Sequence, residues 1–275
     1  MRKTLIAAAF ILLAAHAGAA TPKKTTGGKT ATIYCSQGFQ GPEKWDKQVF
    51  PVDNNGFITI FDGKDFRGWR GYGEEKVPSK WVVEDGCIKF NSQAKGNGGD
   101  IIFAHKFKNF ILDMEWKISK GGNSGIFYLA QETTNDKGQL EPIYISCPEC
   151  QVLDNENHPD AKLGVDGNRK AGSLYDMIPA KPQNAKPYGQ WNKVRIVVNN
   201  GLITHFQNGV QVLQYRMWTP EWTELLQKSK FSEAKWPHAF QLLNNCGGEF
   251  HEGLIGLQDH GNDVWFRNIK VKILK

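Results

Sequence analysis

The chain has 275 residues, of which 40% are hydrophobic and 23% are charged, and its formal net charge at pH 7 is +6. Its Lys and Arg residues are scattered among acidic ones, without the basic stripe or basic helix of a nucleic-acid interface. After the N-terminal segment, no apolar stretch approaches the length of a membrane-spanning helix. We therefore expect neither a nucleic-acid partner nor a membrane anchor.

Residues 1–20 carry the pattern of a cleavable signal peptide. Arg2 and Lys3 precede the apolar stretch 4–15, and the small residues of 17–20 suit cleavage by signal peptidase. The stretch is too short to span a bilayer, and no Cys follows at the cleavage point to carry a lipid. We predict a periplasmic or secreted protein, in which loss of Arg2 and Lys3 lowers the net charge from +6 to +4.

One domain is predicted after the signal peptide. Residues 21–55 are interpreted as a leader and N-terminal extension, whose first part is rich in Lys, Thr and Gly. Removing 20 of the 275 residues leaves 255, which suits a single β-sandwich or barrel. No internal repeat is apparent, so residues 56–275 are predicted to form one domain.

Alternation of apolar and polar residues predicts β-strands along most of this domain. The first hairpin signal is Asp85-Gly86, which lies between the apolar runs 81–83 and 88–90. In the stretch 110–118, every second residue is apolar and charged residues occupy positions between them. A strand with this pattern buries one face and exposes the other.

Two further hairpins are predicted in the second half of the chain. The alternating runs 194–198 and 202–206 flank Asn199-Asn200-Gly201. Asn208-Gly209 then precedes the apolar positions of 210–212. Consecutive short hairpins of this kind are typical of antiparallel sheets.

Helical periodicity is scarce. Its clearest case is 221–229, where apolar residues are spaced for one helix face and Pro220 suits the start. A closing strand is predicted over 265–273, with a break in the alternation at Arg267. The predicted fold class is all-β, an antiparallel β-sandwich or jelly roll with one short helix.

Polar residues spaced by two project to one side of a strand, so they can line a groove on an outer face of the sandwich. Carboxylates and amides bind sugar hydroxyls, and aromatic rings cover the faces of sugar rings. We predict a carbohydrate ligand in such a groove. The candidate pairs are Asp113 and Glu115, Glu149 and Gln151, Ser173 and Tyr175, and Gln258 and His260.

The five cysteines are an odd set, so one or two disulfides would leave at least one free thiol. Cys147-Pro148-Glu149-Cys150 has the spacing of a redox or metal pair. However, the chain has no second Cys-x-x-Cys pair and no thioredoxin-like pattern around this one. We expect the cysteines to serve structure, as disulfides or as buried thiols.

Six runs of sequence together resemble the 3-keto-disaccharide hydrolase domain family. They occur in order and at suitable spacing, so the resemblance covers residues 56–275. The runs are 61–69 (FDGKDFRGW), 81–86 (WVVEDG), 121–127 (GGNSGIF), 149–154 (ECQVLD) with 157–160, 171–175 (AGSLY), and 256–261 (GLQDHG) with 264–269.

The resemblance implies a jelly roll of the concanavalin A-like lectin/glucanase type and cleavage of glycosides that are already oxidised at C3. A ketone at C3 acidifies the C2 proton, so a base removes that proton, the C1 substituent is eliminated, and water then adds. Glu149 or His260 is our candidate for the base. The candidates for binding the hydroxyl and ketone groups are Glu115, Asn123, Gln151, Tyr175 and Gln258.

No cofactor is firmly predicted. Asp154 and His158 flank a loop whose residues 155–157 add further oxygen ligands, so a divalent cation such as Ca²⁺ could bind there. The alternative is a solvated acidic loop. Arg267 is expected to serve structure by pairing with Asp113 or Glu115.

Two other functions remain open on the same fold. A non-catalytic, lectin-like carbohydrate-binding module would need sugar contacts but no base. An ordinary retaining glycosidase would need two carboxylates about 5 Å apart. No Glu-x-Asp-x-x-Glu run of the glucanase type occurs in the chain. A purely structural exported protein is the remaining alternative.

Overall fold

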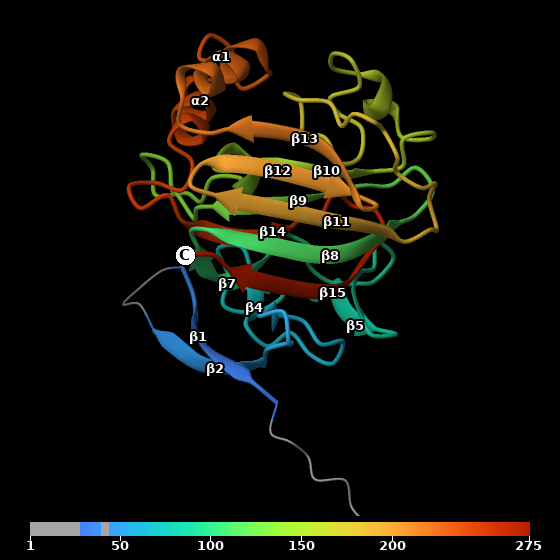
Figure 1. Ribbon diagram of the computed structural model, residues 1–275, viewed down its shortest axis with the longest axis vertical. Helices are drawn as coiled ribbons and strands as arrows, with labels where there is room; N and C mark the ends of the chain where they lie inside the picture. The colour runs from blue at the N-terminus through green and yellow to red at the C-terminus, as the bar shows by residue number, and fades with distance from the viewer. Residues whose placement is uncertain (1–27, 40–43) are drawn as a thin grey trace, which may run out of the picture.

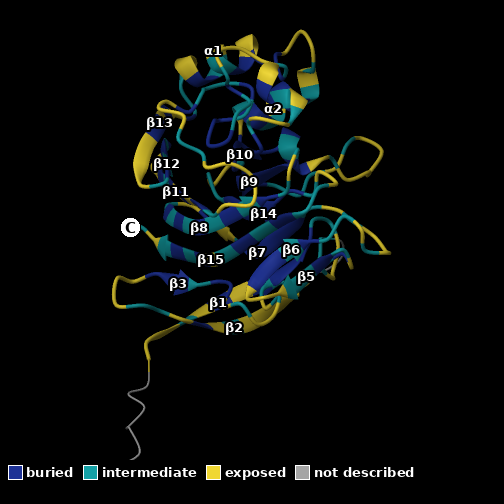
Figure 2. Ribbon diagram, turned by 90° about the vertical axis from the view of Figure 1, so that its right-hand side faces the viewer, coloured by how far each residue is buried: buried dark blue, intermediate teal, exposed yellow. Residues whose placement is uncertain are grey.

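The structure is a computed structural model, and it describes residues 28–39 and 44–275. The predicted signal peptide, residues 1–20, lies outside the described residues. Two antiparallel sheets pack face to face and enclose the core (Figures 1 and 2). The all-β sandwich predicted from the sequence is therefore confirmed.

The smaller sheet has five strands in the order β10-β9-β14-β7-β4. Its strands are β4 Trp69–Gly71, β7 Ile101–Phe107, β9 Asn123–Ala130, β10 Glu149–Leu153 and β14 Gly253–Leu257. Strand β14, from the end of the chain, lies between β7 and β9, which come from much earlier. This strand order decides which polar residues meet on its outer face.

The larger sheet has eight strands, in the order β13-β12-β11-β8-β15-β6-β5, with β3 paired to β15. Its strands are β3 Ile58–Thr59, β5 Trp81–Glu84, β6 Cys87–Phe90, β8 Phe110–Ile118, β11 Asn192–Asn199, β12 Leu202–Gln207, β13 Val210–Arg216 and β15 Val264–Ile273. In β8 the alternate residues are buried, as predicted for 110–118. Trp116 and Phe266 are among the large side chains that fill the space between the sheets.

The three predicted hairpin turns are present. Asp85-Gly86 has φ angles of 50° and 72°, Asn200-Gly201 has 47° and 77°, and Asn208-Gly209 has 50° and 84°. Two successive positive φ angles define the type I′ turn, which favours Asn or Asp followed by Gly. The turn residues therefore select the connections β5–β6, β11–β12 and β12–β13.

The closing strand β15 contains the irregularity that the sequence indicates at Arg267. Its pairing with β8 shifts register between Arg267 and Lys270, and Asn268 has a φ of 54°. Phe266 faces the core before the shift, and Ile269 faces it afterwards. The extra residue of a β-bulge accounts for the broken alternation.

Two α-helices lie at one end of the sandwich, next to β13 and to the short 3₁₀ helix η1, Ile143–Ile145 (Figures 1 and 2). Helix α1, Pro220–Lys228, is the predicted one. Helix α2, Pro237–Asn244, was not predicted, because no side chain caps its start and it is short. A second 3₁₀ helix, η2, spans Pro159–Lys162. No helix in the described ranges is long and apolar enough to cross a membrane.

The N-terminal extension forms a separate hairpin of β1, Thr30–Ser36, and β2, Trp45–Pro51 (Figure 1). Phe50 of this hairpin packs edge-on against Phe103 of β7, with ring centroids 5.5 Å apart. Ile33 and Cys35 are buried on the same side. The extension thus covers part of the five-stranded sheet.

All five cysteines are free and buried. Of the two structural roles expected for them, buried thiols are the one observed. Burial raises the pKa of Cys147 well above its ordinary value. Thiols in this state are weak nucleophiles, which agrees with a structural role.

A polar network crosses the core between the two sheets. The hydroxyl of Tyr128 lies 2.8 Å from His205 Nε2 and 2.6 Å from the Tyr215 hydroxyl. His205 Nδ1 lies 3.1 Å from the Gly172 carbonyl, which accepts, so Nδ1 carries the proton of the neutral ring. Burial lowers the pKa of His205 to about 4, so the ring is neutral at pH 7. The network is therefore satisfied internally and is not a site for substrate.

Candidate functional site

Polar residues from three neighbouring strands meet on the outer face of the five-stranded sheet. Residues directly opposite each other in an antiparallel pair project to the same face. Glu149 is opposite Phe127, and Gln151 is opposite Gly125. Gln258, just beyond β14, donates its N–H to the Gly125 carbonyl at 3.0 Å. Glu149, Gln151 and Gln258 therefore share one face, with Gly125 between them.

Three more predicted residues lie beside this group. Asn123 precedes Gly125 by two residues on β9, so it projects to the same face. Tyr175 donates its N–H to the Glu149 carbonyl at 3.1 Å, which extends the sheet beyond β10. His260 follows Gln258 by two residues, is exposed, and has its ring 6.2 Å from that of His158.

Glu115 does not belong to this group, and the prediction that it shares a groove with Glu149 is wrong. Glu115 lies on β8 of the eight-stranded sheet and faces away from the core. Its carboxylate forms an ion pair with Arg267 at 2.7 Å, one of the two partners expected for that arginine. Both residues lie on alternating strands, but those strands belong to different sheets.

Glu149 is the most unusual group on the outer face. Its side chain is only 7% exposed, and its carboxylate has no hydrogen bond or ion pair among the described residues. Burial raises the pKa of Glu149 to about 8, a rise to which the nearby charges of Asp100 and Asp160 add and which Lys230 opposes. A carboxyl group whose pKa lies near neutral pH is suited to general acid–base catalysis.

Gly125 provides the space into which the Glu149 side chain extends. A Cβ atom at position 125 would collide with the Glu149 carboxylate and would lie only 2.8 Å from its Cγ. The backbone of Gly125 is an ordinary strand, so its glycine is explained by this close approach and not by a turn. Gly125 therefore fixes the place of the carboxylate.

We expect Gly125→Ala to lower kcat/KM by roughly tenfold or more, because displacement of a catalytic group by about 1 Å is costly. The melting temperature should change little, since only a side chain has to move. Gly256→Ala is the matched control on β14, because its Cβ would meet the apolar Ile143 and Phe127 instead. Activity assays and thermal melts of both variants check this; full activity in Gly125→Ala would show that the carboxylate has no fixed place.

Two buried amide oxygens point to a ligand on the same face. Asn123 Oδ1 and Gln258 Oε1 have no hydrogen-bond partner among the described residues, although their side chains are 4% and 9% exposed. An unsatisfied buried acceptor costs about 1–3 kcal/mol. Hydroxyl groups of a substrate would satisfy both atoms. Gln151, by contrast, already uses its side-chain nitrogen on the Arg169 carbonyl at 3.3 Å.

A second set of charged residues surrounds Tyr175, and the sequence analysis missed it. Arg169 binds Asp160 at 2.9 Å and Asp176 at 2.6 Å. The Tyr175 hydroxyl donates to Asp160 at 3.0 Å, and Lys230 Nζ lies 4.4 Å from the Tyr175 ring centre. Arg169, Asp176 and Lys230 lie in loops without periodicity, so alternation did not indicate them.

The loop that could hold a cation is organised by its own hydrogen bonds. The Asp154 carboxylate accepts from Gly121 N, Glu156 N and Asn157 Nδ2. His158 Nδ1 accepts from Asp160 N at 3.1 Å. Over residues 28–39 and 44–275, no three His, Cys, Asp or Glu side chains are grouped as a metal site. A cation at Asp154 and His158 stays a prediction.

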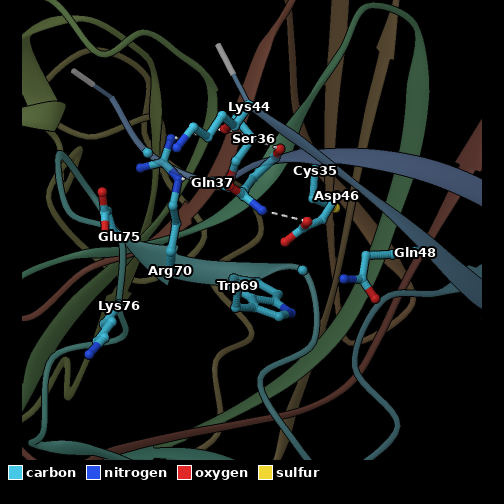
Figure 3. A pocket seen from close by; sticks show the side chains of 13 residues that line it. Cys35, Ser36, Gln37, Lys44, Asp46, Gln48, Trp69, Arg70, Glu75 and Lys76 are labelled. Carbon is cyan, nitrogen blue, oxygen red and sulfur yellow. Dashed lines mark hydrogen bonds between the residues drawn. The ribbon is translucent and has the colours of Figure 1, made fainter. Parts of the chain in front are cut away.

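Two cavities lie elsewhere, and some of the charged groups that line them are already paired. One, of about 410 Å³, lies between the N-terminal hairpin and β4, where Gln37 donates to Asp46 (Figure 3). Arg70, which also lines it, is bound to Glu132. The other, of about 850 Å³, lies on the eight-stranded sheet and includes the Arg195–Asp113 pair. We place the candidate site at Glu149 because unsatisfied groups gather there.

Comparison with known proteins identifies the family of the chain. The sequence profile of the family described as "3-keto-alpha-glucoside-1,2-lyase-like domain" matches residues 56–272. The chain belongs to this family. The match includes all six runs of sequence on which the resemblance rested and every residue of the outer-face group. The predicted family is thus confirmed, and the predicted enzyme class agrees with it.

Relatives of the family are similar along most of their length. A protein of Bacteroides thetaiotaomicron named 3-keto-disaccharide hydrolase is 68% identical over 238 residues, which cover 83% of this chain and 82% of that protein. A crystal structure from Parabacteroides distasonis, described provisionally as a glycosyl hydrolase, is 30% identical with a TM-score of 0.67 and covers 80% of this chain and 95% of its own. A second one from that organism, 24% identical with a TM-score of 0.57, covers 79% and 99% and shares the fold.

Proposed function

We propose that this protein cleaves glycosides whose sugar carries a ketone at C3, and that Glu149 removes the C2 proton. Membership of the family and the name of the relative from Bacteroides thetaiotaomicron support this substrate class. The observation that carries the proposal is the buried carboxyl of Glu149, on a face with two amide oxygens; none of these groups has a partner among residues 28–39 and 44–275. We also propose that the protein is exported, on the signal-peptide pattern of residues 1–20.

The proposed reaction balances without a redox partner. The ionised Glu149 carboxylate takes the C2 proton, and the electron pair of the C2–H bond forms a C2–C3 double bond while C3–O becomes an enolate. Return of those electrons expels the C1 substituent, which leaves as an alcohol after it gains a proton. Water then adds across the C1–C2 double bond, so the sum is hydrolysis.

Glu149 suits the role of base better than His260. His260 is exposed and lies outside β14, whereas Glu149 is held by a strand and buried. The pKa of Glu149, raised to about 8, gives a stronger base than an ordinary carboxylate. Asn123 and Gln258 would orient the sugar by accepting hydrogen bonds from its hydroxyl groups.

A second candidate is an ordinary glycosidase that uses Glu149 with Asp100. Asp100 accepts a hydrogen bond from Asp259 N at 2.8 Å, close to Gln258, and burial raises its pKa to about 7. That chemistry needs a protonated carboxyl group as acid and an ionised one as nucleophile or base. A lectin-like module is disfavoured, because binding alone does not require a buried carboxyl without a partner.

The test is an assay of the purified protein on 4-nitrophenyl α-glucoside and on its 3-keto form, in ordinary water and in deuterated water. We expect cleavage of the 3-keto form only, with deuterium at C2 of the released sugar after correction for spontaneous exchange. Elimination breaks the C2–H bond, whereas direct displacement at C1 leaves it intact. Similar rates on both glycosides, or full retention of the C2 proton, would favour the glycosidase instead.

A further inference from the structure

Lys230 reaches the site from the helical segment at the end of the sandwich. It follows α1, and its backbone N–H donates to Asp176 Oδ2 at 2.7 Å. The other oxygen of Asp176 accepts from Arg169 Nε at 2.6 Å. Asp176 lies next to Tyr175, which continues the sheet beyond β10. Lys230 is thus anchored to the edge of the strand that carries Glu149.

The ammonium group of Lys230 is held by aromatic rings and not by an acid. Its Nζ lies 4.4 Å from the ring centre of Tyr175, 4.9 Å from that of Phe231 and 5.8 Å from that of Tyr144. Among the described residues, no carboxylate lies within 4.0 Å of it. Aromatic faces attract a cation without neutralising it. The positive charge therefore remains available to a substrate.

Tyr175 connects Lys230 with Glu149, because its ring contacts the ammonium group and its backbone N–H donates to the Glu149 carbonyl. The charge of each residue favours ionisation of the other, yet no ion pair joins them within the described part of the chain. Burial lowers the pKa of Lys230, and the nearby carboxylates oppose this. An acid–base group and a cation that are close but apart can act on two different atoms of one ligand.

We propose that Lys230 binds the C3 oxygen of the 3-keto sugar and stabilises the negative charge that develops there as the C2 proton leaves. This assignment rests on the proposed function and adds a second catalytic residue to it. The C2–H bond breaks toward Glu149, and the electron pair moves into C2=C3 while C3=O becomes C3–O⁻ beside the ammonium. No group other than substrate is needed. A fixed charge aimed at an enolate oxygen contributes roughly 10²–10³-fold to the rate.

The test separates proton removal from loss of the leaving group. The probe for the first step is 3-keto-1,5-anhydroglucitol, which has a C2 proton but no leaving group attached to C1 outside the ring. The exchange of its C2 proton in deuterated water is followed by NMR. Lys230→Met should lower this exchange by about 10²–10³-fold. It should lower kcat equally for methyl and 4-nitrophenyl 3-keto-α-glucosides, with a smaller change in KM and an unchanged melting temperature.

A chemical rescue provides the matched control. Alkylation of Lys230→Cys with 2-bromoethylamine gives a side chain that ends in an ammonium group and is nearly as long as that of lysine. The five native thiols are buried and therefore protected from the reagent. At least tenfold recovery of exchange is expected; absence of recovery would overturn the proposal. Undiminished exchange in Lys230→Met, with cleavage lost only for the methyl glycoside, would make Lys230 the acid for the leaving group. Wild-type protein that neither exchanges nor cleaves the keto substrates would refute the proposed function itself.

Discussion

Replacing Glu149 with Gln should lower kcat/KM for a 3-keto glycoside by at least about 10²-fold, the scale expected for a lost acid–base group. The amide keeps the size of the side chain but cannot take a proton. Glu115→Gln is the matched control, because Glu115 is paired with Arg267 on the other sheet. That variant should keep wild-type activity. If Glu149→Gln were equally active, the site would have to be placed elsewhere.

The pH dependence of the wild-type enzyme gives a second test of Glu149 as the base. A base must be ionised to act, and its pKa is raised to about 8, so kcat/KM should rise with pH and level off above that value. The rise should be absent from the residual activity of Glu149→Gln. A rate that instead falls through pH 8 would assign Glu149 as the acid.

Glu149→Gln should also make the protein more stable than the wild type at high pH. The folded-state pKa of Glu149 is raised from 4.5 to about 8, so the folded state holds this proton more tightly than the unfolded state between those values. Wild-type stability is therefore lost as pH rises through this window. Relative to the wild type, Glu149→Gln should gain about 3 kcal/mol in the free energy of unfolding between pH 5.5 and pH 9. Urea unfolding at both pH values measures the difference.

Replacing Glu132 with Ala should cause the largest loss of stability that we predict. Its carboxylate accepts from both terminal nitrogens of Arg70 at 2.6 Å and from Gly73 N at 2.7 Å. The two side chains are 3% and 10% exposed. Removing one partner of a buried pair leaves an uncompensated charge and costs about 3–5 kcal/mol. In a domain of this size the melting temperature should fall by roughly 10 °C.

Asp113→Ala is the matched control for this prediction. Asp113 also forms a bidentate pair, with Nε and one terminal nitrogen of Arg195 at 2.6 Å and 2.7 Å, but that arginine is 47% exposed. Because water screens and replaces such a pair, its loss should cost less than about 1 kcal/mol. Equal shifts in melting temperature for both variants would contradict the role that we assign to burial.

Local sequence patterns predicted strands β5, β6, β8, β11, β12, β13 and β15 and three tight turns, because those features depend on neighbouring residues. Asp85-Gly86, Asn200-Gly201 and Asn208-Gly209 adopt positive φ angles that few other residue pairs tolerate. The break in alternation noted at Arg267 coincides with the bulge in β15. Helix α2 was not predicted, since it has no capping side chain and is stabilised by the burial of Phe240 and Leu243.

The sequence alone determined that the protein is all-β, the family to which it belongs, and most of the outer-face group. The six runs carry the family, and spacing by two placed Glu149 with Gln151 and Gln258 with His260. Only the tertiary structure decided which strands share a sheet. It separated Glu115 from Glu149 and brought Lys230 from a distant loop to within 4.4 Å of the Tyr175 ring centre. Alternation of apolar and polar residues determines which side of a strand is buried. The order of the strands and the burial of the Glu149 carboxyl arise from contacts between segments that are distant in the chain.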